Sequence, residues 1–165
     1  MKATQAVENQ ERVFLVGVSL RKRGAAHHNG AVERESLLEL EELAHSAGAT
    51  VTGSSLQIRE AIDPATLVGK GKLEEVKIEA RLHRAPLIIV DHNLTPVQLR
   101  NMERLTDCRV IDRTQLILDI FARHARSREG QLQVELAQLN YLMPRLAGRG
   151  VELSRLRQMV GKNLG

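Results

Sequence analysis

The arginines near the C-terminal end are the side chains of this sequence best suited to bind phosphate. Residues 121–165 contain eight Lys and Arg side chains against three Asp and Glu, whereas the whole chain has a net charge of +4. Seven of the eight are arginines, whose planar guanidinium can hold two phosphate oxygens and stack on a base. The pattern favours contact with an extended polyanion, and the alternative is a solvated helix face. The predicted nucleic-acid contacts are Arg123, Arg126, Arg128, Arg145, Arg149 and Arg155.

A second candidate for phosphate binding is the glycine–lysine loop formed by Gly69, Lys70, Gly71 and Lys72. Its amides precede a predicted helix and could hold an anion. We expect instead a tight turn, in which the glycines adopt positive φ and the lysines face water. A GTPase loop of the form GxxxxGK[ST] would need a glycine at position 64 or 66, where Pro64 and Thr66 stand. The sequence also lacks DxxG and Asn-Lys-x-Asp, so we predict no catalytic residue and no nucleotide cofactor.

Two aspartates follow predicted strands, where ligands of open α/β sheets commonly bind. We expect Asp91 and Asp112 to cap a loop and a helix, and the alternative is a small-ligand or nucleotide site at these strand ends. The six histidines and the single Cys108 provide one adjacent pair, His27 and His28. Two ligands do not make a metal site, so none is predicted.

The segments that would position these side chains alternate between strands and helices. Buried-strand patterns occur at 13–18, 51–58, 87–91 and 109–112, and helical patterns at 31–46, 72–82 and 96–105. The continuous apolar run at 87–90 is typical of a parallel strand. The order predicts an α/β fold: a small open parallel sheet of about four strands flanked by helices, followed by a long projecting C-terminal helix.

That last helix is predicted to run from Asp112 to about Leu146, with Gly130 and Pro144 as its only weak points. We place an α/β body at 11–126 and a helical arm at 127–165. The arm carries an apolar seam at steps of four, three, four and three residues, formed by Leu132, Leu136, Leu139, Met143 and Leu146. A narrow seam needs a second helix to cover it, so we expect an arm truncated before its partner helix, and self-association is one outcome.

Composition limits the class of protein further. A single cysteine suits a reducing compartment, and no apolar run approaches the roughly 20 residues of a membrane span. With the polar first ten residues, this predicts a cytoplasmic protein. Aromatic residues make up 2% of the chain, which argues against RNA binding through stacked rings.

Several segments together resemble the N-terminal region of HflX, a ribosome-associated GTPase family. They are 67–76 (LVGKGKLEEV), 93–103 (NLTPVQLRNME), 110–123 (VIDRTQLILDIFAR) and 125–139 (ARSREGQLQVELAQL). The resemblance runs from about Glu11 to Arg155, and family members continue into a second long helix and a GTP-binding domain. It implies binding to the large ribosomal subunit and its RNA, and splitting of ribosomes under stress with GTP and Mg²⁺ in the full-length proteins.

These observations predict a ribosome-binding module of an HflX-like GTPase that docks on the large subunit through its basic arm. GTP hydrolysis is not expected of this chain, because the GTP-binding domain of the family is absent from it. The alternatives are a small-ligand or nucleotide-binding α/β domain, and a truncated fragment without function.

Overall fold

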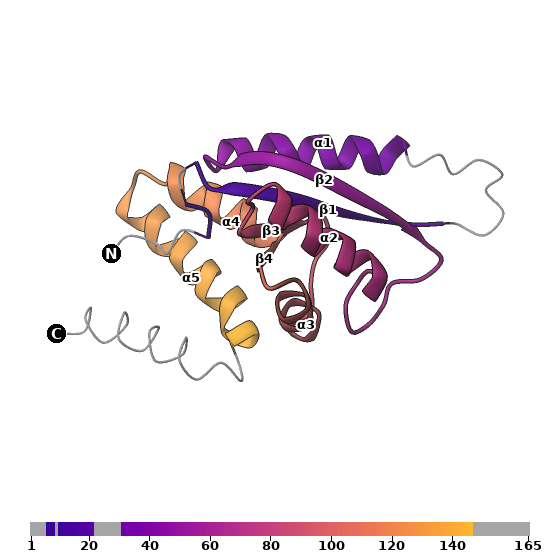
Figure 1. Ribbon diagram of the computed structural model, residues 1–165. Coiled ribbons are helices and arrows are strands. Elements are labelled where there is room, and N and C mark those ends of the chain that lie inside the picture. Colours follow the sequence, from indigo (N-terminus) through magenta and orange to yellow (C-terminus); the bar gives the residue numbers. More distant parts are fainter. Residues whose placement is uncertain (1–5, 9, 22–30, 147–165) are drawn as a thin grey trace.

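Four parallel strands form one sheet at the centre of the molecule (Figure 1). The computed structural model describes residues 6–8, 10–21 and 31–146. The strands are β1 (Arg12–Leu20), β2 (Thr50–Arg59), β3 (Leu87–Val90) and β4 (Arg109–Asp112), in the order β2-β1-β3-β4. All three neighbouring pairs are parallel, which confirms the predicted fold class.

Helices cover both faces of the sheet. They are α1 (Ala31–Ser46), α2 (Lys70–Leu82), α3 (Pro96–Thr106), α4 (Arg113–His124) and α5 (Arg128–Leu146). Figure 1 shows α2 and α3 on one face and α1 and α4 on the other. Each of the first four helices follows a strand and returns along the sheet, so their C-terminal ends lie at the edge where the strands begin.

The two faces of the sheet belong to two hydrophobic cores. Phe14 and Val16 of β1 pack with the α2 and α3 side, whereas Val13 and Leu15 pack with the α1 and α4 side. This follows from the alternation of side chains along a strand. The same alternation divides β3, which explains why its run 87–90 is apolar without interruption.

Several helix ends follow from local chemistry. Thr95 accepts a hydrogen bond from the amide of Gln98, whose side chain accepts from the amide of Thr95, so α3 begins with a capping box. Asp112 accepts from the amide of Gln115 and caps α4, as predicted. Gly48 ends the first helical segment with a φ of 83°, a conformation that favours glycine.

The C-terminal helical segment differs from the prediction. It is interrupted at residues 125–127, so α4 and α5 are separate helices rather than one continuous helix. α5 then folds back beside the body and contacts both α4 and α3 (Figure 1). Pro144 lies inside α5, where the prediction placed a weak point.

Candidate nucleic-acid interface

The connection between α4 and α5 is an ordered turn with its own hydrogen bonds. The backbone of Ala125 is extended, which ends α4. Ser127 then caps α5, because its Oγ accepts from the amide of Gly130 at 3.0 Å. The side-chain amide of Gln131 donates to the carbonyl of Ala125 at 3.2 Å and closes the turn. Ser127 was the sequence signal for this break, and the helical periodicity concealed it.

This turn presents two of the predicted RNA-contacting arginines to solvent. Arg126 and Arg128 are both exposed, and neither side chain forms an ion pair or hydrogen bond within the described part of the chain. Arg128 is the first residue of α5, where the positive end of the helix dipole disfavours a cation. Two exposed guanidinium groups two residues apart, with no partner among the described residues, can bind neighbouring phosphates.

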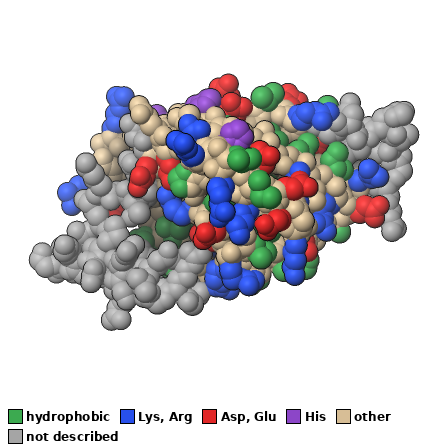
Figure 2. Space-filling model, viewed as in Figure 1, with side chains coloured by type: hydrophobic (Ala, Val, Ile, Leu, Met, Phe, Trp, Pro, Cys, Tyr) green, Lys and Arg blue, Asp and Glu red, His purple; other side chains and the backbone are tan. Residues whose placement is uncertain are grey.

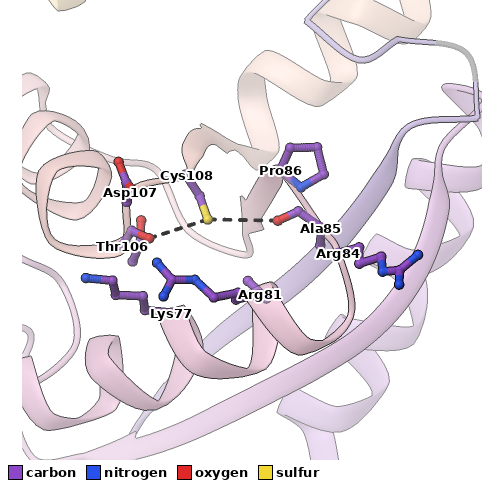
Figure 3. A pocket seen from close by; sticks show the side chains of 9 residues that line it. Lys77, Arg81, Arg84, Ala85, Pro86, Thr106, Asp107 and Cys108 are labelled. Atoms are coloured by element: carbon purple, nitrogen blue, oxygen red, sulfur yellow. Dashed lines mark hydrogen bonds between the residues drawn. The ribbon is translucent and has the colours of Figure 1, made fainter.

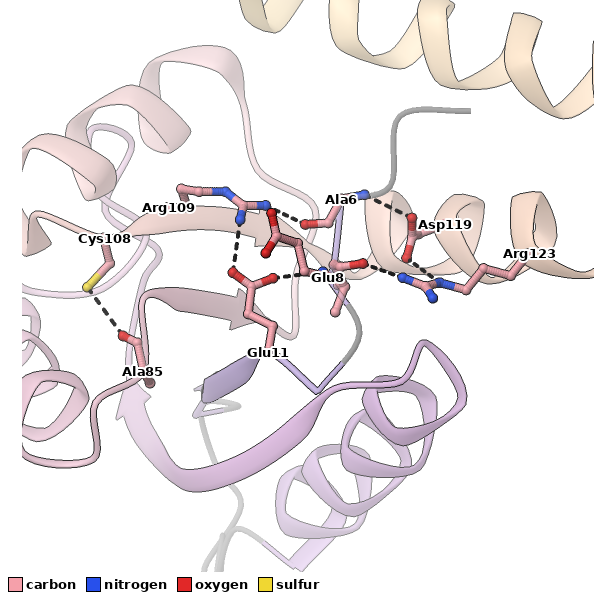
Figure 4. Close-up of polar contacts among 9 residues, drawn as sticks. Ala6, Glu8, Glu11, Ala85, Cys108, Arg109, Asp119 and Arg123 are labelled. Atoms are coloured by element: carbon pink, nitrogen blue, oxygen red, sulfur yellow. Dashed lines mark hydrogen bonds and ion pairs between the residues drawn. The ribbon is translucent and has the colours of Figure 1, made fainter. Parts of the chain in front are cut away.

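Arg123 has a structural role instead. Its Nε donates to Asp119 Oδ2 at 3.0 Å, and its Nη2 donates to the carbonyl of Val7 (Figure 4). The fully buried Asp119 also accepts from the amide of Ala6 at 2.9 Å. The pair therefore holds the segment before β1 against α4, and the i, i+4 spacing of an Asp and an Arg was the signal for it.

Arg145 is also bound to the body. Its guanidinium lies 3.5 Å from the ring centroid of Tyr141 and donates to the carbonyl of Leu94 at 2.9 Å. Tyr141 in turn donates its phenolic hydrogen to the buried carboxylate of Asp112. Burial, followed by the hydrogen bond to that carboxylate, raises the pKa of Tyr141 well above its usual value. These contacts attach the second half of α5 to the carboxyl end of β4.

Asp91 does not cap its loop, which corrects the prediction for that residue. Its carboxylate accepts from Arg113 Nη1 at 2.8 Å and from Ser36 Oγ at 2.5 Å. The hydrogen bond and charge of Asp91 raise the pKa of Arg113. Because Asp112 accepts from the amides of Leu94 and Gln115 as well as from Tyr141, both aspartates at this edge are occupied by the protein itself.

The glycine–lysine loop is a helix start rather than a turn with positive φ. Gly69 is the extended N-cap of α2, with φ −63°, and Gly71 lies in the first turn of that helix. The amide of Gly69 donates to the side-chain oxygen of Gln57 at 3.0 Å. Lys70 is exposed, as expected, and Lys72 pairs with Glu75 at 3.1 Å. A Cβ at Gly69 would lie 2.7 Å from the guanidinium of Arg59, which is the end of a flexible side chain and could move aside.

The apolar seam of α5 is largely open. Leu132, Leu136 and Met143 are 55–59% exposed, and Leu139 is half-buried. The side of α5 that faces the body instead carries Gln138, Tyr141 and Arg145. Polar contacts of these side chains therefore hold α5 against the body. Figure 2 shows that Lys and Arg side chains are interspersed with Asp and Glu side chains over the face of the molecule in view.

Some predicted features lie outside the described residues. Arg149 and Arg155 belong to this group, as does the histidine pair His27 and His28. Within the described residues, no group of three His, Cys, Asp or Glu side chains could hold a metal ion. No described helix is both long enough and apolar enough to cross a membrane.

Two adjacent family profiles match the chain. The family described as GTP-binding GTPase N-terminal matches residues 34–122, and the GTP-binding GTPase middle region matches residues 124–165. The GTPase HflX of Caldanaerobacter subterraneus subsp. tengcongensis is 51% identical over 157 residues, which is 95% of this chain and 35% of that protein. The GTPase HflX of Escherichia coli is 47% identical over 133 residues, 78% of this chain and 30% of that protein. The chain thus spans about a third of the length of these relatives.

A solved structure shares the fold. It is a GTP-binding protein from the archaeon Sulfolobus solfataricus in complex with GDP. The TM-score is 0.59 at 24% identity, over 93% of this chain and 44% of that one.

Proposed function

Since this chain belongs to the family of GTP-binding GTPase N-terminal regions, we propose that it is the ribosome-binding module of an HflX-like GTPase. In this proposal it docks on the RNA of the large ribosomal subunit in the cytoplasm. GTP binding and hydrolysis would belong to the GTP-binding domain of such a protein and not to the residues of this chain.

The observation that carries the proposal is the exposed turn between α4 and α5. Four of the six predicted arginines lie in the described residues, and Arg123 and Arg145 are bound internally. Arg126 and Arg128 are exposed and unpaired in that part of the chain. A cation at the first position of a helix costs stability, so its presence there suggests a use in binding. The contact with RNA is therefore assigned first to Arg126 and Arg128.

The alternative of a small-ligand site at the carboxyl ends of the strands has less support. Asp91 and Asp112 would have to release Arg113 and Tyr141 before they could contact a ligand. A ligand would have to replace these charged and hydrogen-bonded contacts, which makes binding there costly.

The test is co-sedimentation of the full chain with purified large subunits over a series of salt concentrations. Arg126→Glu with Arg128→Glu should weaken binding by at least about tenfold and flatten the log–log salt dependence by somewhat under one unit per lost contact. Lys70→Glu with Lys72→Glu makes the same change in charge and serves as the matched control. Equal retention of the arginine variant and the wild type would remove this turn from the interface.

A further inference from the structure

The outer edge of β2, the side of the strand that faces away from β1, is open among the described residues. β2 is the last strand of the sheet on this side (Figure 1). The carbonyl of Arg59 accepts from the amide of Arg21, which continues β1, so Arg59 directs its backbone towards β1. Because successive residues of a strand direct their backbone groups to alternate sides, those of Ser54, Leu56 and Ile58 point outward. None of these outward groups has a hydrogen-bond partner within the described part of the chain.

β2 also has little of the protection that exposed edge strands usually carry. Natural proteins block such edges with charged side chains, proline or bulges, because an open edge can pair with another strand. The register shift between Val13 and Phe14 of β1 lies near the beginning of β2. From residue 53 to 58 (GSSLQI) the strand has neither a charge nor a proline. This stretch is therefore suited to pair with a further strand.

The neighbouring helices cover the two faces of β2 and leave its outer edge open. Leu56 packs against the core on the α1 side of the sheet. On the other face, a Cβ at Gly53 would lie 3.6 Å from the ring of His83, at the end of α2. Figure 3 shows Lys77 and Arg81 of α2 directed towards the end of α3. That flank of α2 is therefore turned away from the edge.

A second copy of this chain fits the edge by antiparallel self-pairing. With a two-fold axis at Leu56, that residue pairs with its own copy and Ser54 pairs with Ile58. The nearest charged residue, Arg59, then faces Gly53 of the second copy, so no like charges meet along the strands. Ile58, which is 39% exposed in the single chain, becomes covered. The edge is thus complementary to itself in both hydrogen bonding and charge.

The position of α1 places this helix at the same two-fold axis. Gly17 of β1 pairs with Leu56 of β2. A Cβ at Gly17 would lie 3.1 Å from the side chain of Leu37, so this level of α1 lies over the same point of the sheet. Two copies of α1 would therefore run antiparallel and side by side, close to the 8–10 Å spacing of packed helices.

The flank of α1 on the β2 side suits that contact. Ser36 and Glu39 bond to the end of β3 and the start of α4, so their flank faces the centre of the sheet. The opposite flank carries Arg34, Leu38 and Glu41 at steps of four and three residues. Leu38 is 63% exposed and would meet its own copy. Arg34 would then face Glu41 of the second copy, which is electrostatic complementarity across the axis.

We propose that the outer edge of β2 is an interface at which two copies of this chain join their sheets into one continuous sheet, with their α1 helices packed side by side. The proposal rests on the open backbone groups of β2 and on the self-complementary flank of α1. It does not depend on the proposed function, and its test uses neither ribosomes nor RNA.

The test is analytical ultracentrifugation of the full chain over a series of concentrations. Leu136→Lys with Leu139→Lys is present throughout, so that the seam of α5 does not contribute to association. In this background, Ser54→Lys with Ile58→Lys places like charges directly opposite each other, and the dimer Kd should rise by at least about tenfold. A chain that is monomeric at every concentration without the edge substitutions would overturn the proposal.

The matched control is Ser46→Lys with Ile78→Lys, which introduces the same changes at exposed positions on α1 and α2. It should leave the dimer Kd within about twofold, since neither position lies on β2. An equal loss of association in the control and edge variants would overturn the assignment to β2. Thermal unfolding of each variant establishes that it is folded before association is compared.

Charge exchange tests the two-fold arrangement itself. Mixing the lysine variant with Ser54→Glu plus Ile58→Glu should restore association, because each lysine then faces a glutamate. Arg34→Glu should weaken the dimer, and Arg34→Glu with Glu41→Arg should restore it. These two residues are seven positions apart on one helix, beyond the three or four of an intrahelical pair, so the rescue reports a contact between copies. Failure of both rescues would overturn the antiparallel pairing.

Hydrogen exchange distinguishes a second copy from another occupant of the edge. The amides of Ser54, Leu56 and Ile58 should exchange rapidly in dilute solution and become protected as the dimer forms. Protection of these amides in the monomer would mean that another segment of the same chain covers the edge, and would overturn the proposal.

Discussion

Replacing Tyr141 with phenylalanine tests how firmly α5 is held against the sheet. The phenol of Tyr141 donates to Asp112 Oδ2, and the side chain of Asp112 is buried, with 1% exposure. The same oxygen accepts from the amide of Leu94 at 3.0 Å. Phenylalanine removes the hydrogen bond but keeps the ring on which Arg145 stacks.

The expected loss follows from what remains at the carboxylate. A hydrogen bond to a charged group contributes roughly 1.5–3 kcal/mol. Because the amide of Leu94 still donates a hydrogen bond to Asp112 Oδ2, the oxygen keeps one partner, and we expect a loss at the lower end of this energy range. We therefore expect Tyr141→Phe to lower the free energy of docking α5 by about 1.5 kcal/mol.

Hydrogen exchange is the suitable assay, because α5 can detach from the body without global unfolding. Protection of the α5 amides should fall by roughly tenfold in Tyr141→Phe, while the amides of β1 and β3 stay protected. Leu136→Ala serves as the control, since Leu136 is 59% exposed and alanine is a good helix former, so the change should be within about 0.5 kcal/mol. Unchanged α5 protection in Tyr141→Phe would refute the argument that this bond docks the helix.

Three more outcomes are expected. Tyr141 is the single tyrosine, so tyrosinate absorbance reports its ionisation alone. Because the folded state raises the pKa of Tyr141, it keeps the phenolic proton that the unfolded chain loses, and the free energy of unfolding should fall as pH rises above about 10. Tyr141→Phe should remove this contribution to the pH dependence. Arg123→Met should destabilise the fold by about 3–5 kcal/mol in urea unfolding, because it leaves the buried carboxylate of Asp119 without its cation, and a change below about 1 kcal/mol would contradict the burial of this pair. The open seam should cause concentration-dependent association in analytical ultracentrifugation, which Leu136→Lys with Leu139→Lys weakens; a strict monomer at every concentration would contradict it.

The fold could be predicted because its signals are local and repeated. Apolar runs of strand length alternate with amphipathic helices, and short connections between them leave few arrangements other than a parallel sheet. Thr95 followed by Pro96 is a sequence typical of a helix start, and Asp112 caps α4 as predicted. Each of these signals depends on residues within one turn of the chain.

The partners of the charged side chains could not be predicted in the same way. Arg123 contacts Val7 across 116 positions, and Arg145 contacts Leu94 across 51. Composition shows how many cations a segment carries, but only the folded chain shows which of them are already neutralised.

The edge of the sheet that carries the proposed RNA contact is opposite to the one expected for ligands of an open α/β sheet. Ligands of such sheets usually bind where the strands end, and that is where Asp91 and Asp112 lie. Here Arg113 of α4 binds the first carboxylate and Tyr141 of α5 binds the second, so side chains of both helices occupy the carboxyl edge. Arg126 and Arg128 of the α4–α5 turn, which have no ion pair among the described residues, lie instead at the edge where the strands begin. The proposed RNA contact at this edge therefore depends on charge over an exposed surface rather than on an enclosed pocket, which is how a polyanion backbone is generally bound.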